Sequence, residues 1–174
     1  MITHENIHIS IRPMRESDID KILNNFAEQN WYKPRDVLEK YFIRQNNKEL
    51  YVFIADCNND VAGYTVLYLS AENGAFKGKN IPEISDFIVF AKYQRRGIGN
   101  KILDEAEKKA AELSDRVCLG VGLHYGYGSA QRIYAKRGFI PDGSGVWYNN
   151  IRLEQNVECK NDDDLVLYLS KELC

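Results

Sequence analysis

The sequence predicts an α/β fold in which helices pack on one mixed β-sheet. Three observations support this prediction. Segments of alternating apolar and polar residues are interleaved with segments whose apolar residues recur at helical spacing. The run 116–123 is almost continuously apolar, which is typical of a strand covered on both faces. The length of 174 residues fits one domain, and no repeat or domain boundary interrupts residues 1–174.

The first third of the chain is predicted to form a strand followed by two helices. Residues 7–12 alternate in polarity, which favours a strand. Ser17, with Asp20 three residues later, has the pattern of a helix start, and Pro34 suits the first turn of the next helix. The apolar faces of these helices consist of Ile19, Ile22, Leu23 and Phe26, and of Val37, Leu38, Tyr41 and Phe42.

The middle of the chain is predicted to form three strands and the most regular helix. Residues 50–56 and 61–70 are apolar runs separated by the short polar stretch CNND, which indicates a hairpin. Residues 82–90 have the pattern of another strand, and 100–113 that of an amphipathic helix. The buried stripe of this helix is expected to consist of Ile102, Leu103, Ala106, Ala110 and Leu113.

The last third of the chain is predicted to alternate between strands and one short helix. The strand at 116–123 is followed by a helix at 130–137, which Gly138 ends. Residues 144–150 and 164–173 then close the chain as strands. This order of elements is what predicts a mixed sheet covered by helices.

Composition and charge limit the classes of function. Apolar residues make up 44% and charged residues 28% of the chain, as in ordinary soluble globular proteins. The net charge of −2 gives no reason to expect nucleic acid as a partner, and no apolar run approaches the roughly 20 residues of a membrane helix. The polar start lacks a signal-peptide core, so we expect a cytoplasmic protein. The four cysteines lack zinc spacing, so we expect no metal.

A glycine-rich loop, QRRGIGN at 94–100, lies between a predicted strand and a predicted helix. The first amides of a helix are unpaired and attract anions. Gly97 and Gly99 let a phosphate approach the backbone, and Arg95 and Arg96 supply forked donors for its oxygens. The pattern therefore favours a phosphate site, although a strand-to-helix turn that needs glycine explains the same residues.

Two common phosphate motifs do not match this loop. The string GxxxxGK followed by Ser or Thr does not occur, so the loop is not a P-loop. A dinucleotide-binding loop needs GxGxxG, but Asn100, Lys101 and Ile102 follow Gly99. The loop must therefore serve a different phosphate-bearing ligand.

The stretch VFAKYQRRGIGNKIL, 89–103, resembles the acetyl-CoA-binding motif of the GNAT N-acetyltransferases, Q/R-x-x-G-x-G/A. Gln94, Gly97 and Gly99 fill the defined positions of that motif. The stretch AQRIYAKRGF, 130–139, is similar to the second signature of the family, A-x-x-L-Y-x-x-x-G-F. The longer strings GSAQRIYAKRGFIPDGSGVWY and NDDDLVLYLS resemble a bacterial subgroup without a settled substrate. The resemblance implies one mixed, mostly antiparallel sheet, splayed in the middle, with about four helices and CoA in the splay.

The resemblance also implies which residues bind acetyl-CoA. The loop amides of 95–100 would hold the pyrophosphate, and main-chain groups near Phe87 and Val89 would pair with the pantetheine arm. Tyr127 departs from the family pattern, because an asparagine often stands at that place. The implied cofactor-binding residues are Phe87, Val89, Gln94, Arg95, Arg96, Gly97, Ile98, Gly99, Asn100 and Tyr134.

Acetyl transfer to an amine needs a base, because the amine must be neutral to attack. Glu83 stands six residues before Val89, at the place of the acidic residue in the histone-acetylating branch of the family. Strand alternation puts Glu83, Phe87 and Val89 on one face and Asp86 on the other. A bulge in the strand would reverse that assignment, so Asp86 is the second candidate. A surface carboxylate at a strand start is the plain alternative for Glu83.

The departing thiolate needs a proton, and Tyr134 is the candidate acid. It occupies the tyrosine of the second signature, which in relatives often lies near the CoA sulfur. Packing of its ring against apolar neighbours is the alternative role. His124 is expected to be structural. The stretches 30–34 and 161–165 could contact an acceptor, but an aromatic helix connection and a solvated turn are the simpler interpretations.

The sequence therefore predicts an acetyl-CoA-dependent N-acetyltransferase. It would move the acetyl group to a primary amine of a small molecule or peptide by direct attack, without a metal. The alternatives are a non-catalytic acyl-CoA-binding sensor and a small nucleotide-phosphate-binding protein, which the missing phosphate motifs disfavour. The expected partner is an amine substrate, with neither nucleic acid nor membrane involved, and a homodimer is left open.

Overall fold

The computed structural model describes residues 8–173, which form two compact units. The first unit comprises 8–67 and 86–106, and the second comprises 68–85 and 107–173. The helices are α1 (Asp18–Glu28), α2 (Arg35–Asn46), α3 (Ile98–Ala111) and α4 (Gly128–Lys136). The strands are β1 (Ile9–Pro13), β2 (Leu50–Cys57), β3 (Asp60–Tyr68), β4 (Glu83–Val89), β5 (Arg116–Gly122), β6 (Ile140–Tyr148), β7 (Ile151–Arg152) and β8 (Leu165–Glu172).

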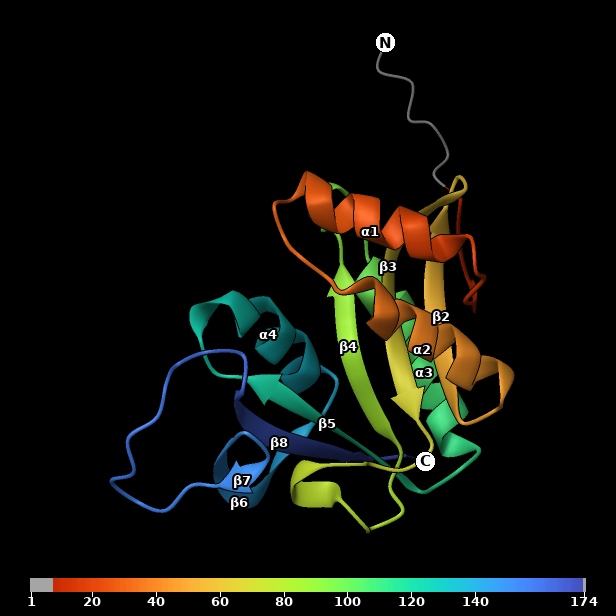
Figure 1. The fold of residues 1–174 in the computed structure, drawn as a ribbon. Coiled ribbons are helices and arrows are strands. Elements are labelled where there is room, and N and C mark those ends of the chain that lie inside the picture. Colours follow the sequence, from red (N-terminus) through yellow and green to blue (C-terminus); the bar gives the residue numbers. More distant parts are fainter. Residues whose placement is uncertain (1–7, 174) are drawn as a thin grey trace. The chain divides into compact units, whose positions relative to one another are not determined.

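The eight strands of the described chain form one mixed sheet in the order β1-β2-β3-β4-β5-β8-β6-β7. Figure 1 labels the helices and the strands β2 to β8. The β4–β5 pair is parallel, whereas β1–β2, β5–β8, β6–β8 and β6–β7 are antiparallel. The predicted fold class is therefore confirmed, with four α-helices in the described residues. The splay in the sheet and the single domain at 1–174 stay predictions.

Several element boundaries differ from the sequence prediction. Helix α3 begins at Ile98 rather than at 100, so Gly99 lies inside it. Leu113 lies beyond the end of α3 and is 43% exposed, so its assignment to the buried stripe was wrong. Strand β7 was not predicted; it follows Asn149 and Asn150, whose positive φ values of 49° and 62° reverse the chain. Ile7, the first residue of the predicted N-terminal strand, lies outside the described residues.

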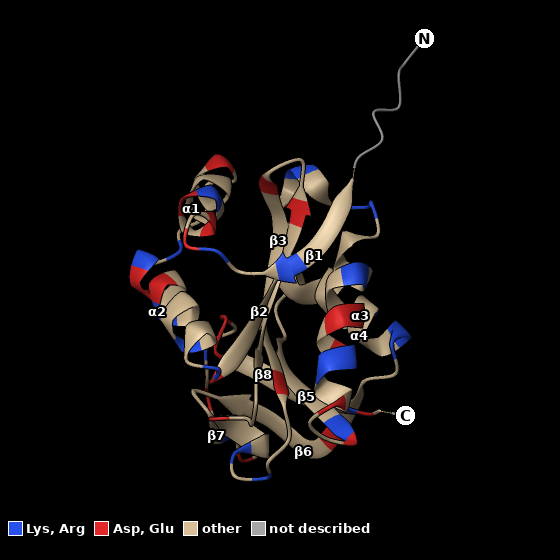
Figure 2. Ribbon diagram, turned by 90° about the vertical axis from the view of Figure 1, so that its right-hand side faces the viewer, with Lys and Arg blue, Asp and Glu red and all other residues tan. Residues whose placement is uncertain are grey.

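In the first unit, helices lie on both faces of the strands. Figure 2 shows α1 and α2 on one side of β2 and β3 and α3 on the other. Asn58 and Asn59, with φ values of 50° and 67°, form the tight turn of the predicted β2–β3 hairpin. The cluster between α3 and the strands consists of Ala55, Cys57, Ala62, Ile98 and Ile102, with Phe87, Val89 and Tyr93 packed against it.

A buried charge network starts helix α1. The guanidinium of Arg12 donates to both oxygens of Asp18 at 2.7 and 2.8 Å and to Asp56 at 2.8 Å. Asp18 also accepts from the backbone N–H of Arg15 at 2.8 Å, so its buried carboxylate fixes the segment that precedes the helix. The network therefore joins α1 to strands β1 and β2.

Gly63 marks a close approach of β3 to β4. A Cβ at this position would overlap the carbonyl oxygen of Ile88 and would lie 3.0 Å from the Cα of Val89. Both of these are backbone atoms, which cannot swing away as a side chain would. The end of β4, which precedes the glycine loop, can therefore pack this closely against β3 only because residue 63 has no side chain.

We expect Gly63→Ala to lower the free energy of unfolding by about 3 kcal/mol, the upper end for overpacking of a core. Chemical denaturation of the full chain measures this. Gly128→Ala is the matched control, because Gly128 has a helical φ of −56° and open space at its Cβ. This control should be neutral or stabilising by up to ~1 kcal/mol. Equal stability of the two variants would contradict the tight β3–β4 contact.

In the second unit, β8 lies between β5 and β6 in the strand order. A bulge interrupts the β6–β8 register between Pro141 and Val146. Glu107 accepts hydrogen bonds from Arg137 at 2.7 Å and from Lys171, and is 8% exposed. This charge cluster joins the last turns of α3 to the end of α4 and to β8.

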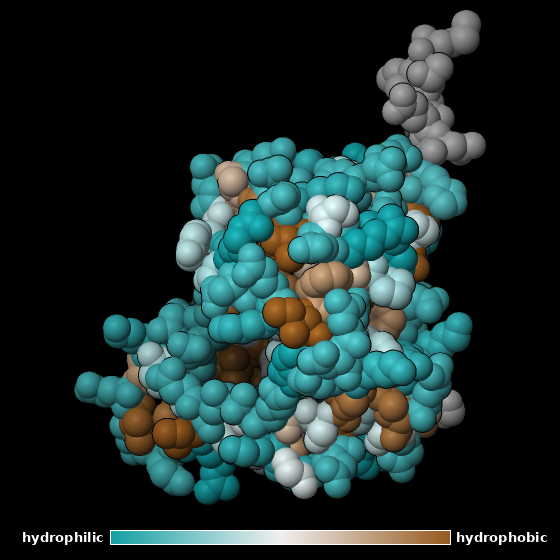
Figure 3. All heavy atoms as spheres, turned by 45° about the vertical axis from the view of Figure 1, so that its right-hand side comes forward, coloured by the Kyte–Doolittle hydropathy of each residue, from teal (hydrophilic) through white to brown (hydrophobic). Residues whose placement is uncertain are grey.

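The surface of the described chain is mixed in polarity. Figure 3 shows hydrophobic side chains lying among hydrophilic ones on the face it presents. Large hydrophobic residues with high exposure include Tyr125 at 98%, Tyr32 at 85% and Trp31 at 58%. The last two lie in the α1–α2 connection and line the hollow described below.

Candidate active site

The glycine loop lies in the first unit, between β4 and α3. A short 3₁₀ turn at Ala91–Tyr93 precedes it, and α3 begins at Ile98. Arg95 and Gly97 both have left-handed backbones, with φ values of 62° and 75°. A Cβ at Gly97 would meet no atom within 4 Å, so positive φ rather than crowding explains the glycine. The loop therefore leaves open space immediately before the first turn of a helix.

Side chains tie the start of this loop to the rest of the unit. The Tyr93 hydroxyl donates to Asp60 at 2.6 Å, and the Lys92 ammonium lies 3.1 Å from the same carboxylate. The side-chain amide of Gln94 donates to the carbonyl of Val89 at 3.0 Å. The motif glutamine thus holds the loop against β4 through its own side chain, a structural role that the motif alone did not reveal.

The charge at the loop suits an anion. Arg95 and Arg96 are exposed, and neither guanidinium forms an ion pair within residues 8–173. The Arg96 guanidinium lies over the ring of Tyr93, 5.9 Å from its centroid. Two cations without acidic partners in the described chain, beside the start of α3, leave positive charge available. The residues present therefore fit a phosphate group.

Phe87 and Val89, the predicted partners of the pantetheine arm, lie on β4 in the first unit. Both side chains pack against the cluster beneath α3. The Val89 carbonyl already accepts the hydrogen bond from Gln94. The main-chain pairing with pantetheine stays a prediction.

Asp86, the second candidate base, is held in an ion pair. Its Oδ2 contacts the ammonium of Lys33 and accepts a hydrogen bond from the Tyr64 hydroxyl at 2.9 Å. Burial, and then the charge of Asp86, raise the pKa of Tyr64 well above its usual value, so the phenol is a fixed donor. Asp86 has a φ of 48°, which breaks the alternation of β4 as a bulge would. The Asp86 carboxylate is thus already paired with a cation and a phenol.

Glu83, the first candidate base, starts β4 in the second unit and pairs with Cys118 of β5. Burial, and then the nearby charge of Glu72, raise its pKa from 4.5 to about 7. Its carboxylate receives no hydrogen bond and no ion pair from residues of the described chain. An efficient base has a pKa near the working pH and a free oxygen for the proton. Of the two carboxylates, Glu83 therefore has the properties of a base.

Tyr134, the candidate acid, lies on α4 in the second unit and is 5% exposed. Its ring packs edge-to-face on Phe139, with centroids 5.7 Å apart. Burial, and then the neighbouring Tyr127, raise the pKa of the phenol above its usual value. The hydroxyl therefore stays protonated at working pH, so it can donate a hydrogen bond but cannot act as a base.

The structure brings His124, Tyr127 and Asp163 together, which the sequence did not predict. One Asp163 oxygen lies 2.9 Å from His124 Nε2 and accepts from the Tyr127 hydroxyl at 3.0 Å. The backbone N–H of Gly126 donates to His124 Nδ1 at 3.1 Å. His124 thus has partners on both ring nitrogens, as expected for a structural histidine.

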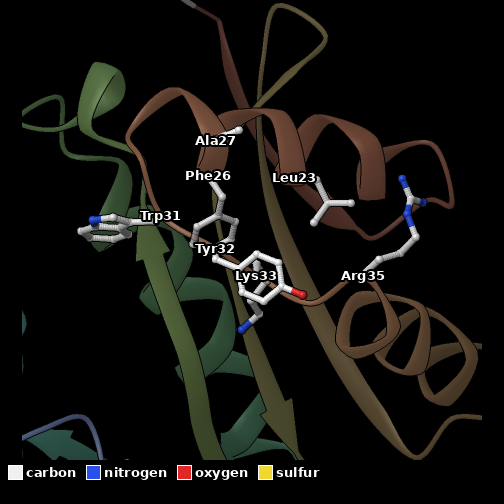
Figure 4. Close-up of a pocket in the computed structure, with 7 residues that line it drawn as sticks. All are labelled: Leu23, Phe26, Ala27, Trp31, Tyr32, Lys33 and Arg35. Carbon is white, nitrogen blue, oxygen red and sulfur yellow. The ribbon is translucent and has the colours of Figure 1, made fainter.

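A hollow of about 300 Å³ lies at the α1–α2 connection in the first unit. Figure 4 shows Lys33 beneath α1 with its nitrogen pointing away from that helix, and Arg35 at the other end. The lining residues are Leu23, Phe26, Ala27, Trp31, Tyr32, Lys33 and Arg35. No pattern in the sequence indicated that Lys33 of this connection would reach Asp86.

The described part of the chain has neither a metal-binding cluster nor a membrane-spanning helix. Within residues 8–173, no group of three or more His, Cys, Asp or Glu side chains could hold a metal ion. No helix of the same residues is long and apolar enough to cross a membrane.

The sequence model of the Acetyltransferase (GNAT) family matches residues 17–139, which include parts of both units. The match covers more than half of the chain, and the chain therefore belongs to this family of acetyl-CoA-dependent acetyltransferases. No curated protein matches the sequence.

Solved structures support the same fold. An N-acetyltransferase from Staphylococcus aureus Mu50 has a TM-score of 0.70 at 20% identity, covering 96% of this chain and 99% of that one. A ribosomal-protein-alanine N-acetyltransferase from Brucella melitensis has a TM-score of 0.67 at 20% identity, covering 94% and 99%. A protein from Salmonella typhimurium, solved with acetyl-CoA as its cofactor, has a TM-score of 0.67 at 15% identity, covering 96% and 95%. These TM-scores establish a shared fold.

Proposed function

We propose that the chain transfers the acetyl group of acetyl-CoA to a primary amine of a small molecule or peptide by direct attack. The amine nitrogen bonds to the acetyl carbon as the carbon–sulfur bond breaks. Glu83 accepts the proton that the amine loses, and Tyr134 donates a hydrogen bond to the departing thiolate. The amides of 95–100 and the guanidinium groups of Arg95 and Arg96 hold the phosphates.

The state of Glu83 carries this proposal. An amine with a pKa of ~10.4 is about 3.4 units from neutral at pH 7, so deprotonation costs about 4.6 kcal/mol. A carboxylate of ordinary pKa is a weak base for that task. The pKa of Glu83 is raised to about 7, and no residue of the described chain occupies its oxygens. Glu83 is thus a matched acceptor for the amine proton at neutral pH.

Thiol release from acetyl-CoA over a panel of amines tests the proposal. The panel contains polyamines, aminoglycosides, amino acids, peptides with free N-termini and lysine-containing peptides. We expect at least one amine to raise thiol release well above the rate of acetyl-CoA hydrolysis without an amine. Calorimetry with acetyl-CoA, CoA and ATP accompanies the panel. Binding of acetyl-CoA without release for any amine would favour the sensor, and preferential binding of ATP would favour a nucleotide-binding protein.

We expect Tyr134→Phe to lower kcat by about 10²-fold, the lower end of the ~10²–10³ for loss of one hydrogen-bond donor to developing negative charge. The raised pKa makes the phenol a weaker acid than a thiol of pKa ~8.5, so hydrogen bonding rather than full proton transfer is the main loss. The dissociation constant of CoA should change much less, because the charge on sulfur develops only during transfer. Steady-state kinetics and calorimetry measure the two quantities.

Tyr125→Phe is the matched control for this variant, because Tyr125 is 98% exposed. It should leave kcat unchanged. If chemistry limits the rate and Tyr134→Phe keeps kcat within about twofold of wild type, Tyr134 has only a packing role.

A further inference from the structure

Lys33 and Asp86 form a partly buried ion pair within the first unit. The Lys33 ammonium contacts Asp86 Oδ2, and the two side chains are 18% and 21% exposed. The same ammonium lies over the ring of Tyr41, 5.9 Å from its centroid. A carboxylate on one side and an aromatic face on the other are what an organic ammonium ion prefers.

The carboxylate of this site is positioned by the fold rather than by Lys33 alone. Tyr64, whose side chain is fully buried, donates its hydroxyl to Asp86. Asp86 also has a left-handed backbone, at φ 48°, which is uncommon within a strand. Asp86 Oδ1 accepts no hydrogen bond from residues 8–173, so the carboxylate has capacity that Lys33 and Tyr64 leave unused.

Lys33, by contrast, belongs to an accessible segment. Lys33 follows Trp31 and Tyr32, which are 58% and 85% exposed. It also lines the open hollow of about 300 Å³ (Figure 4). A ligand that enters this hollow can therefore contact the Lys33 side chain.

We propose that the Asp86–Tyr64–Tyr41 cluster binds a second ammonium group of the acceptor, and that Lys33 occupies this subsite in the free protein. The inference rests on the proposed function and names the acceptor class as a diamine or a longer polyamine. Asp86 directly precedes Phe87, where main-chain pairing with the pantetheine arm is expected. One ammonium displaces Lys33 at Asp86, while the other amino group of the same molecule is acetylated.

Displacement of Lys33 makes a definite prediction about affinity. An incoming ammonium competes with a cation that is always present at the site, so removing that cation should tighten binding. Lys33→Met keeps the apolar stem and removes the charge. We expect Lys33→Met to bind 1,4-diaminobutane about tenfold more tightly than wild type, which corresponds to about 1.4 kcal/mol. The affinity for 1-butanol, which has the same carbon chain but no ammonium group, should stay unchanged.

Three further variants make the test specific. Lys33→Arg keeps a cation and should behave as wild type. The double variant Lys33→Met, Asp86→Asn should lose the gain, because it removes the carboxylate that the ligand would pair with. Lys40→Met removes an exposed pair with Asp36, 2.9 Å long, and should change neither affinity nor fold. Asp86→Asn alone gives a second measure if Lys33→Met unfolds, and should weaken the binding of 1,4-diaminobutane.

Calorimetry without acetyl-CoA gives these affinities, and thiol release with acetyl-CoA is measured separately. Equal affinity of wild type, Lys33→Met and the double variant for 1,4-diaminobutane would overturn the subsite and leave the ion pair as a clamp of the fold. Tighter binding by Lys33→Met without thiol release from any amine would support the subsite and contradict the proposed function. Thiol release with no preference for diamines in any variant would support the proposed function and contradict the subsite.

Discussion

Gly97→Glu is expected to weaken CoA binding by more than 10²-fold while the chain stays folded. The open space at the Gly97 Cβ lies in the loop that directly follows Arg95 and Arg96 and precedes α3, where the phosphate site is proposed. A glutamate there adds a negative charge that would face the phosphates. Like charges brought together at an interface cost several kcal/mol, and about 2.8 kcal/mol already corresponds to 10²-fold. Calorimetric titration with CoA measures the change.

The chain offers a matched control for the backbone strain of this variant. Gly78 has a φ of 76°, almost the 75° of Gly97, and its Cβ position is also open. Gly78→Glu therefore introduces the same charge at the same left-handed conformation, outside the glycine loop. We expect the two variants to lose similar stability and only Gly97→Glu to lose affinity for CoA. Unchanged affinity in a folded Gly97→Glu variant would show that the loop is only a turn.

The sequence predicted the order of elements well because its strands and helices follow their own periodicity. The hairpin between β2 and β3, the helix α3 and the end of α4 at Gly138, with φ 87°, were all expected from local patterns. Leu113 fails because the helical spacing continues past Ala111, where the helix ends. A stripe on a helical wheel does not specify the last residue of a helix.

In the candidate site too, some features could be predicted from the sequence and others could not. The glycine loop was found by its motif, because a left-handed backbone position usually requires glycine, which is visible in the sequence. The left-handed backbones of Arg95 and Asp86 are not visible in this way, since both are ordinary residues in an unusual conformation. The choice between Glu83 and Asp86 depended on that conformation and on Lys33, which is 53 positions away in the chain. No local pattern encodes a partner at that separation.

Glu83→Gln is expected to have the second large effect. It should lower kcat/KM by an amount that depends on pH. The pKa of Glu83 is raised from 4.5 to about 7 by burial and by Glu72. Below about pH 6 the wild-type carboxyl is protonated, so both proteins lack a base and the difference is small. Near pH 7–8 Glu83 is ionised while an amine of pKa ~10.4 is still charged, and the loss should be largest. Toward pH 10 the loss should shrink again, because the amine is neutral without help.

Glu83→Gln, which lowers kcat/KM, should by contrast raise the free energy of unfolding relative to wild type at neutral and higher pH. Because the folded-state pKa of Glu83 is raised, the folded chain holds this proton more tightly than the unfolded chain does. That contribution to stability is fully present below about pH 4.5 and is lost as pH rises through about 7. Glutamine does not titrate, so Glu83→Gln should gain stability relative to wild type as pH rises across this window. Urea unfolding at pH 5 and pH 8 measures the difference.

A buried base with a raised pKa predicts both results together. A surface carboxylate at a strand start would give neither, since its pKa would be ordinary and its removal would leave kcat/KM unchanged. Glu72→Gln serves as the control for the origin of the shift, because the charge of Glu72 is the second cause of the raised pKa. It should lower the pKa of Glu83 and move the acidic limb of the kcat/KM profile to lower pH without abolishing activity. A loss in Glu83→Gln that is independent of pH, with no gain in stability at pH 8, would assign Glu83 to substrate binding rather than to proton transfer.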